Sequence, residues 1–132
     1  MGIRNAKLNF RQVEENHIME NIIYNELRNR GYRVDIGMVE CYGKNTLGKT
    51  TRKQYEIDFV ASKGSKKYYI QSAFAMNNPE KTQQEKNSLM RINDYFKRII
   101  IIKDHIKPRR DEQGIVIMGI IYFLLDESSL EV

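Results

Sequence analysis

Two consecutive runs of alternating polar and apolar residues constrain the fold of this chain more than any other feature. The runs are Gln54–Ser62 and Lys67–Phe74, and the segment Lys63–Lys66 that joins them contains a glycine. Alternation with a period of two is typical of strands, and a glycine-containing connection between two such runs indicates a β-hairpin. The centre of the chain is therefore expected to be an antiparallel pair of strands.

The first strand of this hairpin carries acidic residues among apolar ones. Regular alternation divides six of its residues between two faces, with Ile57, Phe59 and Ala61 on one and Glu56, Asp58 and Val60 on the other. Gln71 and Ala73 follow on the neighbouring strand. A carboxylate in the middle of a hydrophobic strand is costly unless another group pairs with it. Asp58 is therefore the position that a functional account has to explain.

Hydrophobic periodicity on both sides of the hairpin predicts further helices and strands. Helices are expected at 12–30, 79–94 and 122–128, and strands at 32–39, 98–103 and 115–121. The Gly-, Thr- and Lys-rich residues 40–53 are expected to form an exposed loop, and residues 1–11 an extended entry segment. The resulting order is α-β-β-β-α-β-β-α, which predicts one α/β domain over residues 1–132, with a mixed sheet flanked by helices.

Composition excludes several classes of protein. A chain of 132 residues with 41% hydrophobic and 30% charged residues fits one globular domain. The net charge of +5 is compatible with a polyanionic partner. The single cysteine rules out an internal disulfide, and the apolar run Ile115–Leu125 is too short to cross a bilayer. We expect a cytoplasmic protein without a membrane partner.

A phosphate-binding motif occurs in the predicted loop. Gly43–Thr50 matches the pattern G-x-x-x-x-G-K-[ST], in which backbone N–H groups cradle phosphates at the start of a helix. The residues after Thr50 are strand-like, so the helix that this chemistry requires is missing. We therefore expect no nucleotide site here, although thermal stabilisation by Mg²⁺–ATP would reveal one.

A family resemblance covers nearly the whole chain. The residues that carry it are Gly2–Ala6, Phe10–Arg11, His17–Leu27, Arg30–Tyr32, Glu56–Ala61, Tyr69–Ala73 and Phe123–Asp126. In this order and spacing, the sequence resembles the C-terminal domain, of uncharacterised function, found in many archaeal and bacterial AAA-type ATPases. That domain is similar to the PD-(D/E)XK, or restriction-endonuclease-like, fold group. The resemblance implies an ATPase partner in cis or in trans, and an excised C-terminal module or a stand-alone version of it.

The resemblance also implies a metal site, and one position of this chain departs from the family's pattern for that site. Nucleases of this fold bind Mg²⁺ or Mn²⁺ with a helix glutamate, a strand aspartate and a third group on the next strand. Glu20, Asp58 and Gln71 match these positions, as catalytic and metal-binding residues. Ala73 stands at the position of the lysine, so the resemblance implies weak or lost catalysis. Lys86, and less directly Lys81, are the candidates to replace the missing cation.

Several functions therefore remain open. The first is a catalytically degraded nuclease fold that binds nucleic acid, with DNA favoured, beside its ATPase. The expected binding residues are basic: Lys44, Lys49, Arg52, Lys53, Lys66 and Lys67. The alternatives are an active Mg²⁺- or Mn²⁺-dependent endonuclease, and a module that docks on the ATPase without touching nucleic acid. A homodimer is compatible with each of them.

Overall fold

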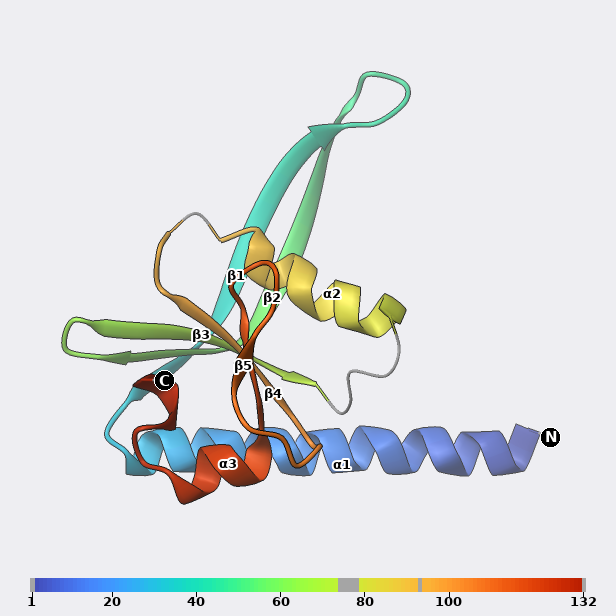
Figure 1. Cartoon of the computed structure of the whole chain (residues 1–132). Helices are drawn as coiled ribbons and strands as arrows, with labels where there is room; N and C mark the ends of the chain where they lie inside the picture. The colour runs from blue at the N-terminus through green and yellow to red at the C-terminus, as the bar shows by residue number, and fades with distance from the viewer. Residues whose placement is uncertain (1, 74–78, 93, 132) are drawn as a thin grey trace.

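The fold is a six-stranded mixed sheet with helices on both faces (Figure 1). A computed structural model of the chain describes residues 2–73, 79–92 and 94–131. In chain order the elements are α1 (Gly2–Asn29), β1 (Arg33–Lys44), β2 (Thr50–Lys63), β3 (Lys66–Ala73), α2 (Pro79–Met90), β4 (Lys97–Ile102), β5 (Arg109–Arg110), β6 (Val116–Gly119), α3 (Ile120–Leu125) and the 3₁₀ turn η1 (Ser129–Glu131). This confirms the predicted α/β class.

The sheet is antiparallel in its first half and mainly parallel in its second. Its strand order is β1-β2-β3-β4-β6-β5. β1, β2 and β3 form an antiparallel meander, whereas β4 lies parallel to both β3 and β6. The short β5 pairs antiparallel with β6 at the far edge. α2 supplies the crossover that a parallel β3–β4 pair requires.

Each face of the sheet carries its own apolar core. On one face, Met19, Ile23 and Leu27 from α1 pack with Phe123 from α3. On the other face, Leu89 from α2 belongs to a second cluster. β4 serves both clusters, since Ile99 and Ile101 belong to the first, and Ile100 and Ile102 to the second. The strand predicted at 98–103 is therefore present, and its four isoleucines are buried on both faces of the sheet.

α1 buries only some of the apolar residues that recur along it at helical spacing. Met19, Ile23 and Leu27 are buried, whereas Ile18 and Ile22 remain 54% and 39% exposed. The helix ends where Gly31 adopts a φ of +89°, a left-handed conformation that glycine accepts without strain. The chain can therefore turn at once into β1.

Four sequence-based expectations differ from the structure. Residues 2–11 are helical rather than extended, because α1 begins at Gly2. The predicted loop at 40–53 is largely strand, since β1 runs to Lys44 and β2 starts at Thr50. The predicted polar loop at 104–113 contains β5, so three strands follow α2 instead of two. The last α-helix spans Ile120–Leu125 and not 122–128.

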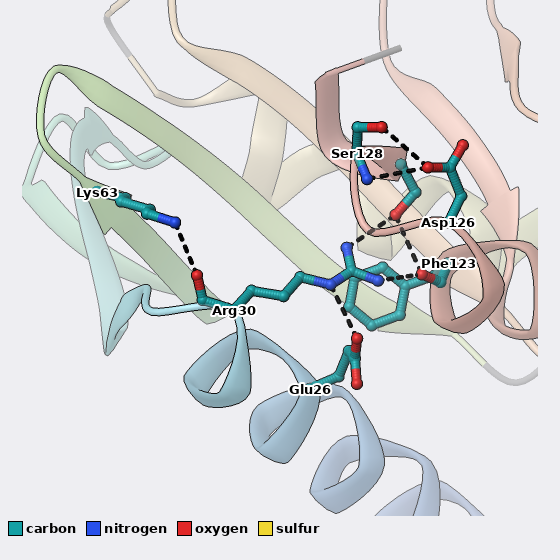
Figure 2. Close-up of polar contacts among 7 residues, drawn as sticks. Glu26, Arg30, Lys63, Phe123, Asp126 and Ser128 are labelled. Carbon is teal, nitrogen blue, oxygen red and sulfur yellow. Dashed lines mark hydrogen bonds and ion pairs between the residues drawn. The ribbon is translucent and has the colours of Figure 1, made fainter.

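One buried arginine ties the end of α1 to the C-terminal segment (Figure 2). The guanidinium of Arg30 donates to Glu26 Oε1 at 2.9 Å, to Ser129 Oγ at 3.0 Å and to the carbonyl of Phe123. It also lies over the Phe123 ring, 4.5 Å from its centroid. The motifs at 30–32 and 123–126, which are far apart in sequence, therefore meet in one network.

Candidate functional site at the fork between β2 and β3

A β-bulge interrupts β2 at the acidic position. Asp35 pairs with Val60 and Gly37 pairs with Ile57, so one residue of β1 faces two residues of β2, Asp58 and Phe59. An extra residue bends the strand and breaks its alternation. Ile57 accordingly packs with Val60 in the α2-side cluster, while Phe59 packs in the α1-side cluster. The predicted division of this strand into two faces is wrong for Ile57, which shares a face with Val60 and not with Phe59 and Ala61.

Gly37 makes room for the bulge. A Cβ atom at this position would lie 2.8 Å from Val60 Cγ2 and 2.9 Å from Ile57 Cβ. Such distances are shorter than carbon atoms allow, so a side chain at Gly37 would push β1 away from the bulge. Sequence reasoning missed both the bulge and this glycine, and an isolated glycine in a strand pattern was the signal that points to a bulge.

Gln71 bridges the point where β2 and β3 separate. Backbone pairing between these strands covers Phe59–Lys63 and ends at Ile70. Beyond this point, Gln71 Oε1 accepts the N–H of Asp58 at 2.7 Å, and Gln71 Nε2 donates to the carbonyl of Glu56 at 3.1 Å. The Gln71 side chain is 97% buried. Its amide thus substitutes for the backbone hydrogen bonds that the diverging strands no longer make.

Asp58 completes the bridge from the other strand. Its Oδ2 accepts the N–H of Ser72 at 2.8 Å. The pKa of Asp58 is raised to about 6, and burial is the largest cause. The hydrogen bond from the Ser72 N–H lowers the pKa, whereas the negative charges of Glu20 and Glu56 raise it. The sheet therefore holds this carboxylate in surroundings that disfavour its ionised form.

The three predicted metal ligands are only partly brought together. Asp58 and Gln71 are adjacent through the hydrogen bonds described above, and Glu20 is close enough to affect Asp58 electrostatically. The Glu20 side chain is 39% exposed and lies 3.8 Å from His17 Nδ1. In the part of the chain that the structure describes, no three His, Cys, Asp or Glu side chains gather as a metal site. Because Gln71 is committed to the backbone, these residues fit a catalytic divalent cation poorly.

Lys86, the predicted replacement for the missing cation, forms an ion pair with Asp111. Its ammonium lies 2.8 Å from Asp111 Oδ2, and both side chains are largely buried. Asp111 follows β5 at the far edge of the sheet, so β3, β4 and β6 separate this ion pair from β2. Lys86 is therefore engaged away from Asp58 in this structure, and its catalytic role stays a prediction. The side chain of Lys81 lies outside the described part of the structure, as does Phe74.

Ala73 is buried with apolar side chains. It belongs to the cluster on the α2 face that includes Ile57, Tyr69 and Ile102. Only 8% of the residue is exposed. The position that would carry a lysine in the implied nuclease site is therefore closed by packing, and a cation there would need new space.

The six predicted basic residues fall into two separate groups. Lys44, Lys49, Arg52 and Lys53 all lie on the hairpin formed by β1 and β2. Lys66 lies at the opposite end of β2, where it pairs with Glu131, and Lys67 lies over the rings of Tyr69 and Phe96. These two lysines are engaged within the domain. The four cations of the first group are all exposed and share one hairpin.

Comparison with known proteins gives one relative. The chain is 30% identical over 124 residues to an uncharacterized protein of Haemophilus influenzae. The matched region covers 94% of this chain but 27% of that relative, so the chain spans about a quarter of the relative's length. No family model and no solved structure matches the chain. Among the described helices, none has the length and apolar composition needed to cross a bilayer.

Proposed function

We propose that this chain is a restriction-endonuclease-like domain that has lost catalysis, binds nucleic acid and serves as an accessory module of an AAA-type ATPase. The order of elements supports this fold. A helix, an antiparallel three-stranded meander, a second helix and a parallel fourth strand follow one another. Asp58 lies on the second strand and Gln71 on the third, as the sequence resemblance implies.

The hydrogen bonds of Gln71 at the fork between β2 and β3 are the main observation that supports the proposed loss of catalysis. A metal-dependent nuclease needs ligand oxygens aimed at the cation, and a nearby positive charge at the scissile phosphate. Here the oxygen and nitrogen of Gln71 both bind the backbone of β2. Ala73 is buried and Lys86 is paired elsewhere. The former ligand positions now stabilise the sheet.

The charge distribution supports nucleic-acid binding. The net charge is +5, and the four exposed cations of the β1–β2 hairpin lie on one projecting element. Contacts between such cations and phosphates release counterions, which makes binding depend strongly on salt and weakly on sequence. This is the behaviour expected of a module that retains the surface of a nuclease without its reaction.

A binding and cleavage assay tests the proposal. Labelled single- and double-stranded DNA are incubated with the wild-type chain and with Asp58→Ala in Mn²⁺, and binding is followed by fluorescence anisotropy over a salt series. We expect intact DNA in both reactions, and binding whose affinity falls as salt rises. Cleavage by the wild type that is absent from Asp58→Ala would instead establish an active endonuclease. Absence of binding at moderate salt would contradict the proposal and favour a protein-docking module.

The ATPase partner is tested separately on the longer relative. About three quarters of the H. influenzae protein lies outside the region matched by this chain, which leaves room for another module. We expect the full-length relative to hydrolyse ATP in the presence of Mg²⁺. A relative that is purified in folded form and neither binds nor hydrolyses ATP would contradict this part of the proposal.

A further inference from the structure

We infer that the part of the β1–β2 hairpin formed by residues 37–57, here called the arm, enters a groove of duplex DNA with its turn leading. The inference rests on the proposed nucleic-acid binding and adds to it the form of the ligand and the element that meets it. Figure 1 shows the outer part of the arm projecting beyond the helices and the other strands.

The shape of the arm fits a DNA groove. β3 pairs with β2 only from Phe59 onward, whereas β1 and β2 stay paired from Gly37 and Ile57 out to Lys44 and Thr50. At 3.3–3.4 Å per residue, this two-stranded ribbon extends about 25 Å beyond the three-stranded part of the sheet. The major groove of B-DNA admits a two-stranded β-ribbon, whereas the major groove of duplex RNA is too narrow for side chains to read. Duplex DNA is therefore the ligand that this shape favours.

The outer part of the arm has the charge that a groove lined by phosphates requires. From Cys41 to Lys53 the sequence contains four cations and no acidic residue. Lys44 and Lys49 flank the turn and are exposed, and no described residue pairs with either ammonium group. Lys53 lies 5.3 Å from the centroid of the Tyr55 ring, and Arg52 pairs with Glu40. At least three cations are thus available to phosphates.

The turn at the tip is held by hydrogen bonds and carries an exposed apolar side chain. Asn45 Oδ1 accepts the N–H groups of Leu47 and Lys49, both at 3.0 Å. The N–H of Gly48 donates to the carbonyl of Asn45, and Gly48 adopts a φ of +77°. This framework fixes Leu47, which is 79% exposed. An ordered apolar tip between two lysines is suited to contact base edges, including the thymine methyl group, while the lysines contact the backbone.

The structure offers a matched control surface. Lys107, Arg109 and Arg110 are exposed, and β5 lies at the edge of the sheet opposite to β1. Asp111 and Glu112 follow directly in sequence, whereas the outer part of the arm, from Cys41 to Lys53, contains no acidic residue. Removing three charges from either place changes the net charge of the protein equally. A difference between the two variants therefore reports the position of the charges.

The test compares the wild type with two triple variants on a short labelled DNA duplex. The arm variant is Lys44→Gln, Lys49→Gln and Lys53→Gln, and the edge variant is Lys107→Gln, Arg109→Gln and Arg110→Gln. We expect the arm variant to bind at least about tenfold more weakly, and its salt slope to fall by about 2 to 3. The edge variant should change affinity by less than about threefold. Circular dichroism and thermal unfolding verify that both variants fold.

A Leu47→Ser variant and single-stranded DNA separate groove insertion from general attraction. We expect the wild type to prefer duplex over a single strand of equal length, and Leu47→Ser to reduce that preference. Equal losses in the two triple variants, or equal affinity for the two forms of DNA, would overturn the inference. If the wild type binds duplex and the arm variant binds it as tightly, only the arm inference fails. If the wild type binds no DNA, the proposed function fails as well.

Discussion

At the scale of single residues, Asp58 occupies a place where its charge is unfavourable. Its pKa is raised from 3.8 to about 6, chiefly by burial. A carboxyl group with a raised folded-state pKa favours the folded protein at low pH, because the folded state then binds the proton more tightly than the unfolded chain. This contribution is fully present below pH 3.8 and is lost as the pH rises to about 6.

Asp58→Asn should therefore stabilise the protein at neutral pH. The amide oxygen can still accept the Ser72 N–H, and the cost of a buried charge disappears. A shift of about two pKa units corresponds to an upper limit of about 3 kcal/mol, and we expect a gain of about 2 kcal/mol in the free energy of unfolding at pH 7.5. The gain should shrink as the pH falls from 6 towards 4. Urea denaturation over this pH range measures it.

Asp35→Asn provides the control for this prediction. Asp35 lies on β1, its side chain is 53% exposed, and it pairs with Arg33. A surface ion pair of this kind contributes little, so we expect a change of less than about 1 kcal/mol without the same pH dependence. If Asp58→Asn destabilised the protein at pH 7.5, the ionised carboxylate would contribute a stabilising interaction that its burial does not explain.

At the scale of elements, the fork between β2 and β3 depends on one amide. In Gln71→Leu, the new side chain has a similar volume but cannot form the two hydrogen bonds to β2. The Asp58 N–H and the Glu56 carbonyl then lose these partners. Each buried unsatisfied group costs about 1–3 kcal/mol, so we expect a loss of about 2–4 kcal/mol in the free energy of unfolding. Chemical denaturation of the variant measures this loss.

Gln71→Glu separates the two hydrogen bonds. A carboxylate can accept the Asp58 N–H but cannot donate to the Glu56 carbonyl, and it adds a negative charge beside Asp58. We expect this variant to be least stable at neutral pH and to recover part of its stability in acid, when the new carboxyl is protonated. Stability independent of pH would contradict the close approach of the two side chains.

The elements that sequence patterns predict well are those with a buried face. The hairpin at 54–74, the start of α2 at Pro79 and the doubly buried β4 follow from alternation, proline and a β-branched run. Residues 40–53, the outer part of the arm, were interpreted as a loop because their described side chains are exposed on both faces, so this segment lacks the alternation that marks a half-buried strand. The bulge at Asp58 was missed because pairing with β1 creates it, and Gly37 was its one signal in the sequence.

For the candidate site, too, the sequence indicates which residues are unusual but not which partners they contact. Asp58 and Gln71 stand out in the sequence as polar residues in apolar strands, and the structure brings them together. Their hydrogen bonds to the backbone could not be predicted, because they depend on where two strands part. The ion pair of Lys86 with Asp111 could not be predicted either, because helix periodicity gives no information about a partner on a distant edge of the sheet.

At the scale of the whole molecule, Arg30 joins α1 to the C-terminal segment. Its side chain is 6% exposed and binds Glu26, Ser129 and the Phe123 carbonyl. Arg30→Lys keeps the charge, but one ammonium group cannot reach all three partners or reproduce the planar contact with the Phe123 ring. We expect a loss of about 2–3 kcal/mol in the free energy of unfolding, measured by urea denaturation.

Arg33→Lys is the matched substitution on the surface. The Arg33 side chain is 82% exposed, so we expect a change of less than about 0.5 kcal/mol. Equal stability of the Arg30→Lys and Arg33→Lys variants would show that the C-terminal segment is held by apolar packing alone.

The contacts of Arg30 also set an order of events during synthesis. Arg30 is separated from Phe123 by 93 residues and from Ser129 by 99. Lys66 and Lys97 likewise bind Glu131 and the carbonyl of Leu130. A growing chain therefore contains α1 and the hairpins long before the segment that closes over them has been translated. Until that segment leaves the ribosome, the apolar face of α1 lacks Phe123 and Leu130, and apolar surface exposed in this way during folding is prone to aggregate.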